Sequence, residues 1–432
     1  MKTNLRTLLL ICHFVMLKSI AQPTTTPWLR DYLLKQPGSA LSTLINDPAK
    51  YRLQVLYIQI DREAGNKPKL TPQYFHYDPS LYFNPASTVK MPLAYLALDK
   101  LNQMNQPGID LYTPVEFLKS RPWQTELLTD STARNGKPSI AHFIKKAFLV
   151  SDNDAYNRLY QFVGQRPVHD RLWELGYKDA VIPRQFLGLS PDKGRYTNAL
   201  RFVDSTGRLL WEQPEGFNPT AIPHGEPVLI GQAHMNQNEE LVKAPFDFTL
   251  HNRLSLGDLA NMLLSVMVPE AFTQKQQFNF KPSDYQFLRY WHSAYPSETD
   301  EPKYDTVKYY DSYVKFFFRD STHRMPAGVR VFNKVGWAYG FLTDVSYVVD
   351  FEKGIEYLLA ATVYVNSDGV VNDSEYDYEN LGWPFLNQLG QAIYRYEQQR
   401  PKAQKPNLDY LKLEYGKRNP LDKQPVIEEV DN

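Results

Sequence analysis

The chain has 432 residues with 48 basic and 48 acidic side chains, which permits one large domain with a sizeable core or two ordinary domains. The balanced charge, without a run of Lys or Arg, argues against a nucleic-acid partner. A single Cys excludes a disulfide within the chain and a thiolate zinc cluster, so the composition favours a globular protein acting on a small or polymeric neutral substrate.

The N-terminal residues have the pattern of a secretory signal peptide. Lys2 and Arg6 precede an apolar stretch from Leu8 to Leu17, and small residues follow at the two positions that a signal peptidase inspects. The stretch is too short to span a bilayer. The sequence therefore predicts a signal peptide over residues 1–21 and a periplasmic or secreted protein.

Two other interpretations of this segment are weaker. One is a buried N-terminal helix. The other is lipidation of Cys12, but Ile11 is bulky where a lipoprotein signal has a small residue. Cleavage after residue 21 would remove three basic residues and the Cys, leaving a slightly acidic chain without a thiol. Such a chain would depend on its core alone for stability.

Two strands and two helices are expected first. Alternating β-formers predict a strand over residues 52–60, with residues 73–77 as its partner. Residues 91–101 are apolar on nearly all sides, as in a helix enclosed by protein. A second helix is predicted over residues 139–149, with Ser139 as its N-cap.

The middle of the chain differs from the rest in composition and in its predicted secondary structure. Between about residues 196 and 249, Pro and Gly are frequent, and only short strands are expected, over 200–203 and 208–211. Helical periodicity returns over residues 254–264. No internal repeat is evident, and no segment after the N-terminal stretch is apolar for the length of a membrane span.

Near the C-terminus, β-formers predict three consecutive antiparallel strands over residues 329–333, 343–351 and 356–365. A last helix is expected over residues 379–399. The residues after Arg400 are polar and interrupted by Pro, which predicts a loosely held tail.

The first segment with chemical potential is Ser87-Thr-Val-Lys90, at the head of the enclosed helix. A lysine one turn after a serine lies on the same helix face, where it can remove the hydroxyl proton if burial lowers its pKa. A capping Ser and a solvated Lys would be the ordinary interpretation. The apolar helix that follows favours a functional Lys90.

The second and third segments are Ser151-Asp-Asn153, directly after a predicted helix, and Lys334-Val335-Gly336, after a predicted strand. Small polar residues after a helix are usually caps or turns, and a strand lysine is usually exposed. As functional groups, Ser151 would relay a proton and Lys334 would face the nucleophile from an edge strand.

The order of the three segments is more specific than any one of them. Ser-x-x-Lys, then Ser-Asp-Asn, then Lys-Thr/Ser-Gly is the signature of class A β-lactamases and penicillin-binding proteins, and this chain has it with Val335 in place of the hydroxyl residue. The spacing of 64 positions from Ser87 to Ser151, and the flank Met325-Pro-Ala-Gly328, also match. Residues from about 50 to 400 therefore resemble the class A β-lactamase family of serine hydrolases.

This resemblance implies an α/β (α+β) fold, in which helices pack on an antiparallel sheet of about five strands and the active site lies between the sheet and an all-helical subdomain. It implies one hydrolase domain over residues 22–400, with insertions near 196–249 and 285–320, followed by a polar tail over 401–432. We expect a monomer that needs neither a cofactor nor a metal ion.

The resemblance also implies catalytic roles. Ser87 would be the acylated nucleophile, and Lys90 would be its base or proton relay. Ser151 would protonate the leaving nitrogen of the substrate. Lys334 would attract the substrate carboxylate and tune Ser151.

Further residues would bind the substrate. Asn153 would hold a substrate amide, and Gly336 would let the substrate approach the strand closely. The backbone N–H groups of Ser87 and Trp337 would form an oxyanion hole, which stabilises charge that appears only in the tetrahedral state.

The chain departs from the family where the acyl-enzyme is hydrolysed. The family carries a water-activating Glu roughly 35 residues beyond Ser-Asp-Asn, whereas residues 182–192 contain none. Asp192, Glu212 or Glu215 could substitute only in a rebuilt loop. Without a positioned base deacylation should be slow, because general-base assistance contributes roughly 10²–10⁴-fold.

Two further departures concern substrate recognition and length. Val335 removes a hydroxyl that helps to bind the carboxylate, and no Arg follows shortly after Lys334. The spacing of 183 positions from Ser151 to Lys334 exceeds the family's usual spacing. The excess fits the segment 196–249 and the aromatic segment 285–318, which could wall the active site.

Three functions remain open. The chain is expected to be a β-lactamase-like hydrolase that opens a cyclic amide through an acyl-Ser87 intermediate. Alternatively, it is a peptidase or esterase that acts on cell-wall peptides, or a binder that keeps the fold without catalysis. A zinc hydrolase is disfavoured, because the nine His include neither His-x-His nor His-Glu-x-x-His.

Overall fold

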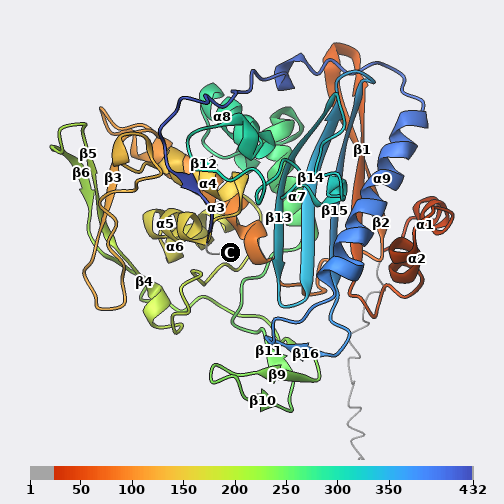
Figure 1. Ribbon diagram of the computed structural model, residues 1–432, viewed down its shortest axis with the longest axis horizontal. Helices are drawn as coiled ribbons and strands as arrows, with labels where there is room; N and C mark the ends of the chain where they lie inside the picture. The colour runs from red at the N-terminus through yellow and green to blue at the C-terminus, as the bar shows by residue number, and fades with distance from the viewer. Residues whose placement is uncertain (1–23, 431–432) are drawn as a thin grey trace, which may run out of the picture.

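A computed structural model describes residues 24–430; the predicted signal peptide and Cys12 lie outside these residues. The main sheet has five antiparallel strands in the order β13-β14-β15-β1-β2 (Figure 1). These are β13 Val329–Ala338, β14 Phe341–Asp350, β15 Ile355–Tyr364, β1 Gln54–Glu63 and β2 Lys67–Phe75. The expected antiparallel sheet of about five strands is confirmed.

Helices cover both faces of this sheet (Figure 1). On one face lies α9 (Trp383–Gln399), with α1 (Pro27–Leu34) and α2 (Ser39–Asn46) beyond it. On the other face α7 (Leu256–Met267) packs on β14, and α8 (Pro282–Ser293) packs on β13. The double cover explains why every residue of β14 is buried.

Two strands differ from the sequence prediction for physical reasons. β2 begins six residues before the predicted strand and includes Pro68 and Pro72, which an edge strand tolerates because one side of its backbone is unpaired. β13 does not end at Asn333 but continues to Ala338, so that Lys334 and Gly336 lie within a strand at the sheet edge.

A layer of helices lies beside β13 (Figure 1). It comprises α3 (Lys90–Met104), α4 (Ile140–Leu149), α5 (Asn153–Val163) and α6 (Gln165–Glu174). The first ten residues of α3 are all buried, which confirms the enclosed helix. Ser139 caps α4 as predicted, since its side chain accepts a hydrogen bond from the backbone N–H of His142 at 3.2 Å.

The segment 196–249 consists of short strands, including the two predicted ones. They are β4 Tyr196–Thr197, β5 Ala199–Val203, β6 Leu209–Gln213, β7 Gly216–Phe217, β8 Leu229–Ile230, β9 Ala233–Met235, β10 Leu241–Val242 and β11 Phe246–Asp247. β5 and β6 form a sheet with β3 (Val115–Leu118) at the outer edge of the helical layer. β9 pairs with β16 (Val370–Val371) in the small lobe of β8 to β11 below the main sheet (Figure 1).

The C-terminal segment is polar as expected but is not loosely held. Its strand β17 (Val426–Ile427) pairs in parallel with β12 (Lys303–Tyr304). Leu411 is fully buried in the core, and the Arg418 guanidinium donates to the backbone carbonyls of Pro296 and Thr299. These buried contacts fix the segment, which polar composition alone did not indicate. Within residues 24–430, no helix has the length and apolarity needed to cross a membrane.

Candidate active site

Ser87 lies in a short 3₁₀ turn, Ala86–Val89, that leads directly into α3. The side chain is partly exposed, although the residues around it are buried. Ala86 before it has φ of 42°, a left-handed conformation that costs an alanine energy and that the surrounding structure must hold. Such strain is typical of functional sites.

Lys90, one turn later, is completely buried and points back to the serine. Its Nζ donates hydrogen bonds to Oγ of Ser87 at 2.8 Å and to Oδ1 of Asn153 at 2.7 Å. It also donates to Ser151, through both Oγ at 3.2 Å and the backbone carbonyl. The first two predicted segments therefore meet at one ammonium group.

Ser151 occupies the junction between α4 and α5, again with a left-handed backbone (φ 68°). The junction is fixed by Asp152, whose side chain accepts from the backbone N–H of Ala155 at 2.8 Å and pairs with Lys146 at 3.2 Å. These bonds aim the Ser151 hydroxyl inward. It is 1% exposed.

Lys334 reaches the same hydroxyl from β13. Its Nζ donates to Oγ of Ser151 at 2.9 Å and to the carbonyl of Val335 at 2.8 Å, and the residue is 2% exposed. Ser151 thus lies between two buried lysines, and all three predicted segments converge on one site.

Burial controls the charge of both lysines. It lowers the pKa of Lys90 to about 7, against a smaller opposing effect of Asp152. Burial also lowers the pKa of Lys334 well below its usual range, and the neighbouring Lys90 lowers it further. Each lysine can therefore be neutral near neutral pH, which an exposed lysine cannot.

Gly336 is required by the close approach of β13 to the Ser87 turn. A Cβ at this position would lie 2.5 Å from the carbonyl oxygen of Pro85 and 2.9 Å from the backbone nitrogen of Ser87. Trp337, the next residue, packs its ring against Phe316 on the α9 side of the sheet, with ring centroids 5.7 Å apart. Only the backbone of Trp337 is therefore available to the site.

The segment in which the family carries its water-activating Glu brings a phenylalanine to Lys90. The ring of Phe186 lies 5.5 Å from Lys90 Nζ and stacks on Tyr156 at 4.4 Å. Asn157 fixes it, because its Oδ1 accepts from the Phe186 backbone N–H at 2.7 Å. The sequence analysis did not identify Phe186 or Asn157 as site residues. Phe186 could have been found from its position, because it lies 35 residues beyond Ser151, where the family carries its water-activating Glu.

The carboxylates considered as substitutes do not reach this site. The Asp192 side chain is 93% exposed, Glu212 is exposed, and Glu215 pairs with Arg121. Among residues 24–430, no carboxylate is hydrogen-bonded to Ser87, Lys90 or Asn153. In the same residues no group of three or more His, Cys, Asp or Glu side chains is placed to hold a metal ion.

Comparisons with known proteins agree with this site. Residues 39–221, which include Ser87, Lys90, Ser151 and Asn153, match the model of the beta-lactamase enzyme family. None of the curated proteins matches the sequence.

Solved structures of low sequence identity are similar over most of the chain. A beta-lactamase from Sphaerobacter thermophilus is 14% identical, with a TM-score of 0.45, covering 84% of this chain and 98% of its own. A beta lactamase from Xanthomonas campestris pv. campestris is 13% identical, with a TM-score of 0.44, covering 85% and 97%. The protein PBP-A is 13% identical, with a TM-score of 0.43, covering 87% and 100%. Residues 39–221 are thus similar to the beta-lactamase enzyme family, and the hydrogen bonds that join Ser87, Lys90 and Ser151 lie within this range.

Proposed function

We propose that this protein is a secreted serine hydrolase that cleaves a β-lactam amide through an acyl-Ser87 intermediate. The observation that carries the proposal is the 2.8 Å hydrogen bond between Lys90 Nζ and Ser87 Oγ, made by a lysine that is completely buried. A buried lysine with a lowered pKa can accept the hydroxyl proton and make the serine a nucleophile. The apolar N-terminal stretch supports export, and we propose a monomer with a single hydrolase domain.

Acylation needs only the groups of this cluster. Neutral Lys90 takes the proton of Ser87 Oγ as this oxygen bonds to the carbonyl carbon. The C–N bond then breaks, and the Ser151 hydroxyl, which hydrogen-bonds both lysines, donates its proton to the leaving nitrogen. Ser151 is reprotonated by Lys90. The proton of Ser87 thus ends on the nitrogen, and the lysine and Ser151 return to their starting states.

Substrate recognition would use the remaining residues. The backbone N–H groups of Ser87 and Trp337 would receive the oxyanion, and the Asn153 amide would hold the substrate amide. A substrate carboxylate would favour the protonated form of Lys334, because an opposite charge raises the pKa of an amine that burial has lowered. Gly336 keeps β13 close enough to Ser87 for these groups to act together.

A second candidate function is a penicillin-binding-protein-like peptidase or esterase that acts on cell-wall peptides. The specific observation in its favour is Phe186, an apolar ring beside Lys90 where a water-activating carboxylate would be needed. Without such a base the acyl-enzyme should persist. The third alternative, a binder without catalysis, is disfavoured because Ser87, Lys90, Ser151 and Lys334 all remain hydrogen-bonded to one another.

Intact-mass spectrometry with a labelled penicillin tests these functions. We expect a covalent adduct on the wild-type chain and none on Ser87→Ala. An adduct that disappears within seconds supports a β-lactamase, and one that persists for hours supports the peptidase-like alternative. If no β-lactam or activated ester forms an adduct, both enzymatic functions are wrong.

A further inference from the structure

A cavity of about 710 Å³ lies between the segment 183–195 and the segment 221–251, which contains the small lobe. Its wall is charged, although the chain as a whole is neutral. The charged lining residues are Arg184, Lys193, Arg195, Asp192 and Asp247. A cavity of this size and polarity is suited to part of a small polar ligand.

Of the two arginines that line this cavity, Arg195 lies 3.7 Å from Asp192, whereas Arg184 has no carboxylate partner among residues 24–430. The Arg184 guanidinium makes no hydrogen bond or ion pair with any residue between 24 and 430, although the residue is half-buried. Arg195, in contrast, donates to the carbonyl of Asn218 at 2.7 Å, and Lys193 lies 5.3 Å from the ring of Trp123. The Arg184 guanidinium is therefore available to pair with a bound anion.

The backbone of Arg184 is held on both sides. Its N–H donates to Oδ1 of the buried Asn252 at 3.2 Å, and its carbonyl accepts from the hydroxyl of Tyr156 at 2.7 Å. Tyr156 also stacks on Phe186. The cation is therefore positioned before a ligand arrives, which reduces the ordering cost of binding.

The two histidines of the cavity neither neutralise the charge of Arg184 nor add positive charge to the cavity. Burial and the charge of Arg184 lower the pKa of His251 to about 3, and burial lowers the pKa of His224. Both rings are neutral at neutral pH. Three arginine and lysine side chains then line the cavity with two acids, of which Asp192 is almost fully exposed and lies 3.7 Å from Arg195.

Two neighbours of the cavity lie close to the catalytic cluster in the chain or in space. Phe186, two residues after Arg184, lies 5.5 Å from Lys90 Nζ. On the other side, the ring of His251 lies 5.7 Å from that of Tyr339, in the turn that follows β13. A substrate acylating Ser87 could therefore extend a substituent from the cluster into this cavity.

We propose that this cavity binds a carboxylate carried on the acyl part of the substrate, with Arg184 as its ion partner. The planar guanidinium can donate two parallel hydrogen bonds to a carboxylate, a geometry that the Lys193 ammonium does not offer. This inference rests on the proposed acylation of Ser87 and adds a preference among substrates to it.

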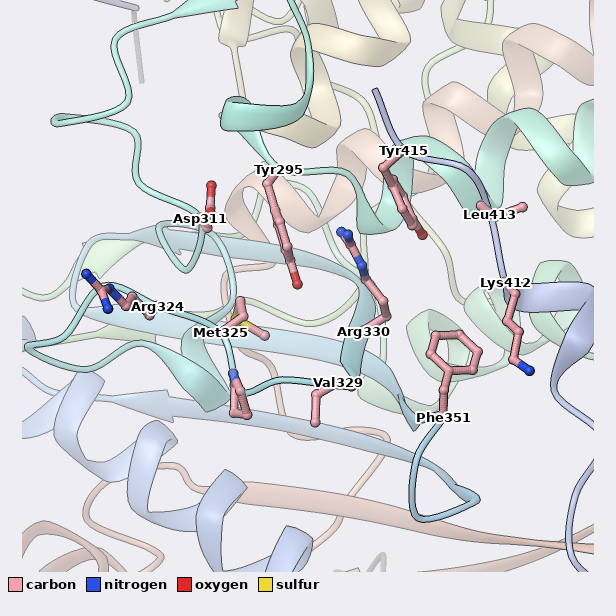
Figure 2. Close-up of a pocket in the computed structure, with 12 residues that line it drawn as sticks. Tyr295, Asp311, Arg324, Met325, Val329, Arg330, Phe351, Lys412, Leu413 and Tyr415 are labelled. Carbon is pink, nitrogen blue, oxygen red and sulfur yellow. The ribbon is translucent and has the colours of Figure 1, made fainter. Parts of the chain in front are cut away.

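A second cavity, of about 630 Å³, shows what distinguishes Arg184. It lies at the far end of β13, where Figure 2 shows Arg330 between Tyr295 and Tyr415. Arg330 donates to Glu298 at 3.0 Å, and its guanidinium carbon lies 4.3 Å and 3.6 Å from the two tyrosine rings. Its charge is already compensated, so this cavity gives no comparable reason to bind an anion.

Two penicillins that differ only in a side-chain carboxylate test the proposal. Benzylpenicillin and its α-carboxy derivative are reacted with the full chain, and adduct formation is followed by intact mass. We expect Arg184→Gln to lower the rate with the carboxylated compound, relative to benzylpenicillin, by about tenfold or more. Arg208→Gln, which removes an exposed cation paired with Asp204 outside the cavity, should preserve the ratio.

An unchanged ratio in Arg184→Gln would overturn the inference while leaving acylation of Ser87 intact. If neither penicillin reacts, these compounds cannot test the cavity through acylation, and glutarate, a simple dicarboxylate, then tests it by calorimetry. We expect glutarate to bind wild type at least tenfold more tightly than Arg184→Gln. Equal or undetectable binding to both proteins would overturn the inference.

Discussion

Lys90 is a candidate base because its neighbours are polar but not acidic. It donates to Ser87, Ser151 and Asn153, while the nearest carboxylate, Asp152, is occupied as the cap of α5 and as the partner of Lys146. Burial therefore lowers its pKa with little electrostatic opposition. The sequence indicated a buried lysine, but the absence of a paired acid required the structure.

The pKa of about 7 predicts how acylation depends on pH. Only neutral Lys90 can accept the Ser87 proton, so the rate of adduct formation should rise about tenfold per pH unit below 7 and level off above it. Measuring that rate with a labelled penicillin from pH 5 to pH 9 checks this. Lys90→Arg should slow it at least about 10²-fold, because arginine stays protonated.

Lys100→Arg is the matched control for Lys90→Arg. Lys100 also lies on α3, and burial lowers its pKa to about 8, but it donates to Gln213 at 2.6 Å and to the carbonyl of Phe162, away from Ser87. Its replacement should leave the pH profile in place. A rate that does not change between pH 5 and pH 9 would contradict the role of Lys90.

At the scale of elements, the site depends on the contact between β13 and the turn that carries Ser87. The sequence predicted the strand over residues 329–333 and the helix that follows the Ser87 turn, and it predicted Lys334 on an edge strand. It did not predict α5 and α6, which follow Ser151 directly, nor the packing of Phe186 on Lys90. Periodicity describes which face of an element is buried, whereas a contact between distant loops depends on tertiary packing.

Gly336→Ala tests the contact between β13 and the Ser87 turn. The new methyl group would lie 2.5 Å from the Pro85 carbonyl oxygen, so β13 or the turn must move. A shift of about 1 Å at a reacting group can cost about 10²-fold, and we expect a loss of this size in the rate of adduct formation. The thermal midpoint of unfolding, measured in parallel, separates a local shift from a failure to fold. A variant that reacts at the wild-type rate would show that the contact is not needed.

At the scale of the whole molecule, the C-terminal segment contacts residues that are far from it in the sequence. The C-terminal segment adds β17 to β12 and places Tyr410 on a buried ion pair, where Arg62 Nη2 donates to its hydroxyl at 2.9 Å. Arg62 in turn pairs with Glu356 at 2.6 Å on the neighbouring strand β15. Composition predicted a loosely held tail because most of its residues are polar. Stability depends instead on its few buried side chains.

Leu411→Ala and Leu421→Ala form a matched pair that tests this role of the C-terminal segment. Leu411 is fully buried in the core, whereas Leu421, ten residues later, is 84% exposed. Removing a buried leucine side chain typically costs 2–5 kcal/mol, and exposed substitutions stay within about 0.5 kcal/mol. We therefore expect urea unfolding to shift to a clearly lower midpoint for Leu411→Ala only. If both variants unfold with the wild-type midpoint, the segment does not contribute to the core in solution, because a leucine that packs there cannot be truncated without leaving a cavity.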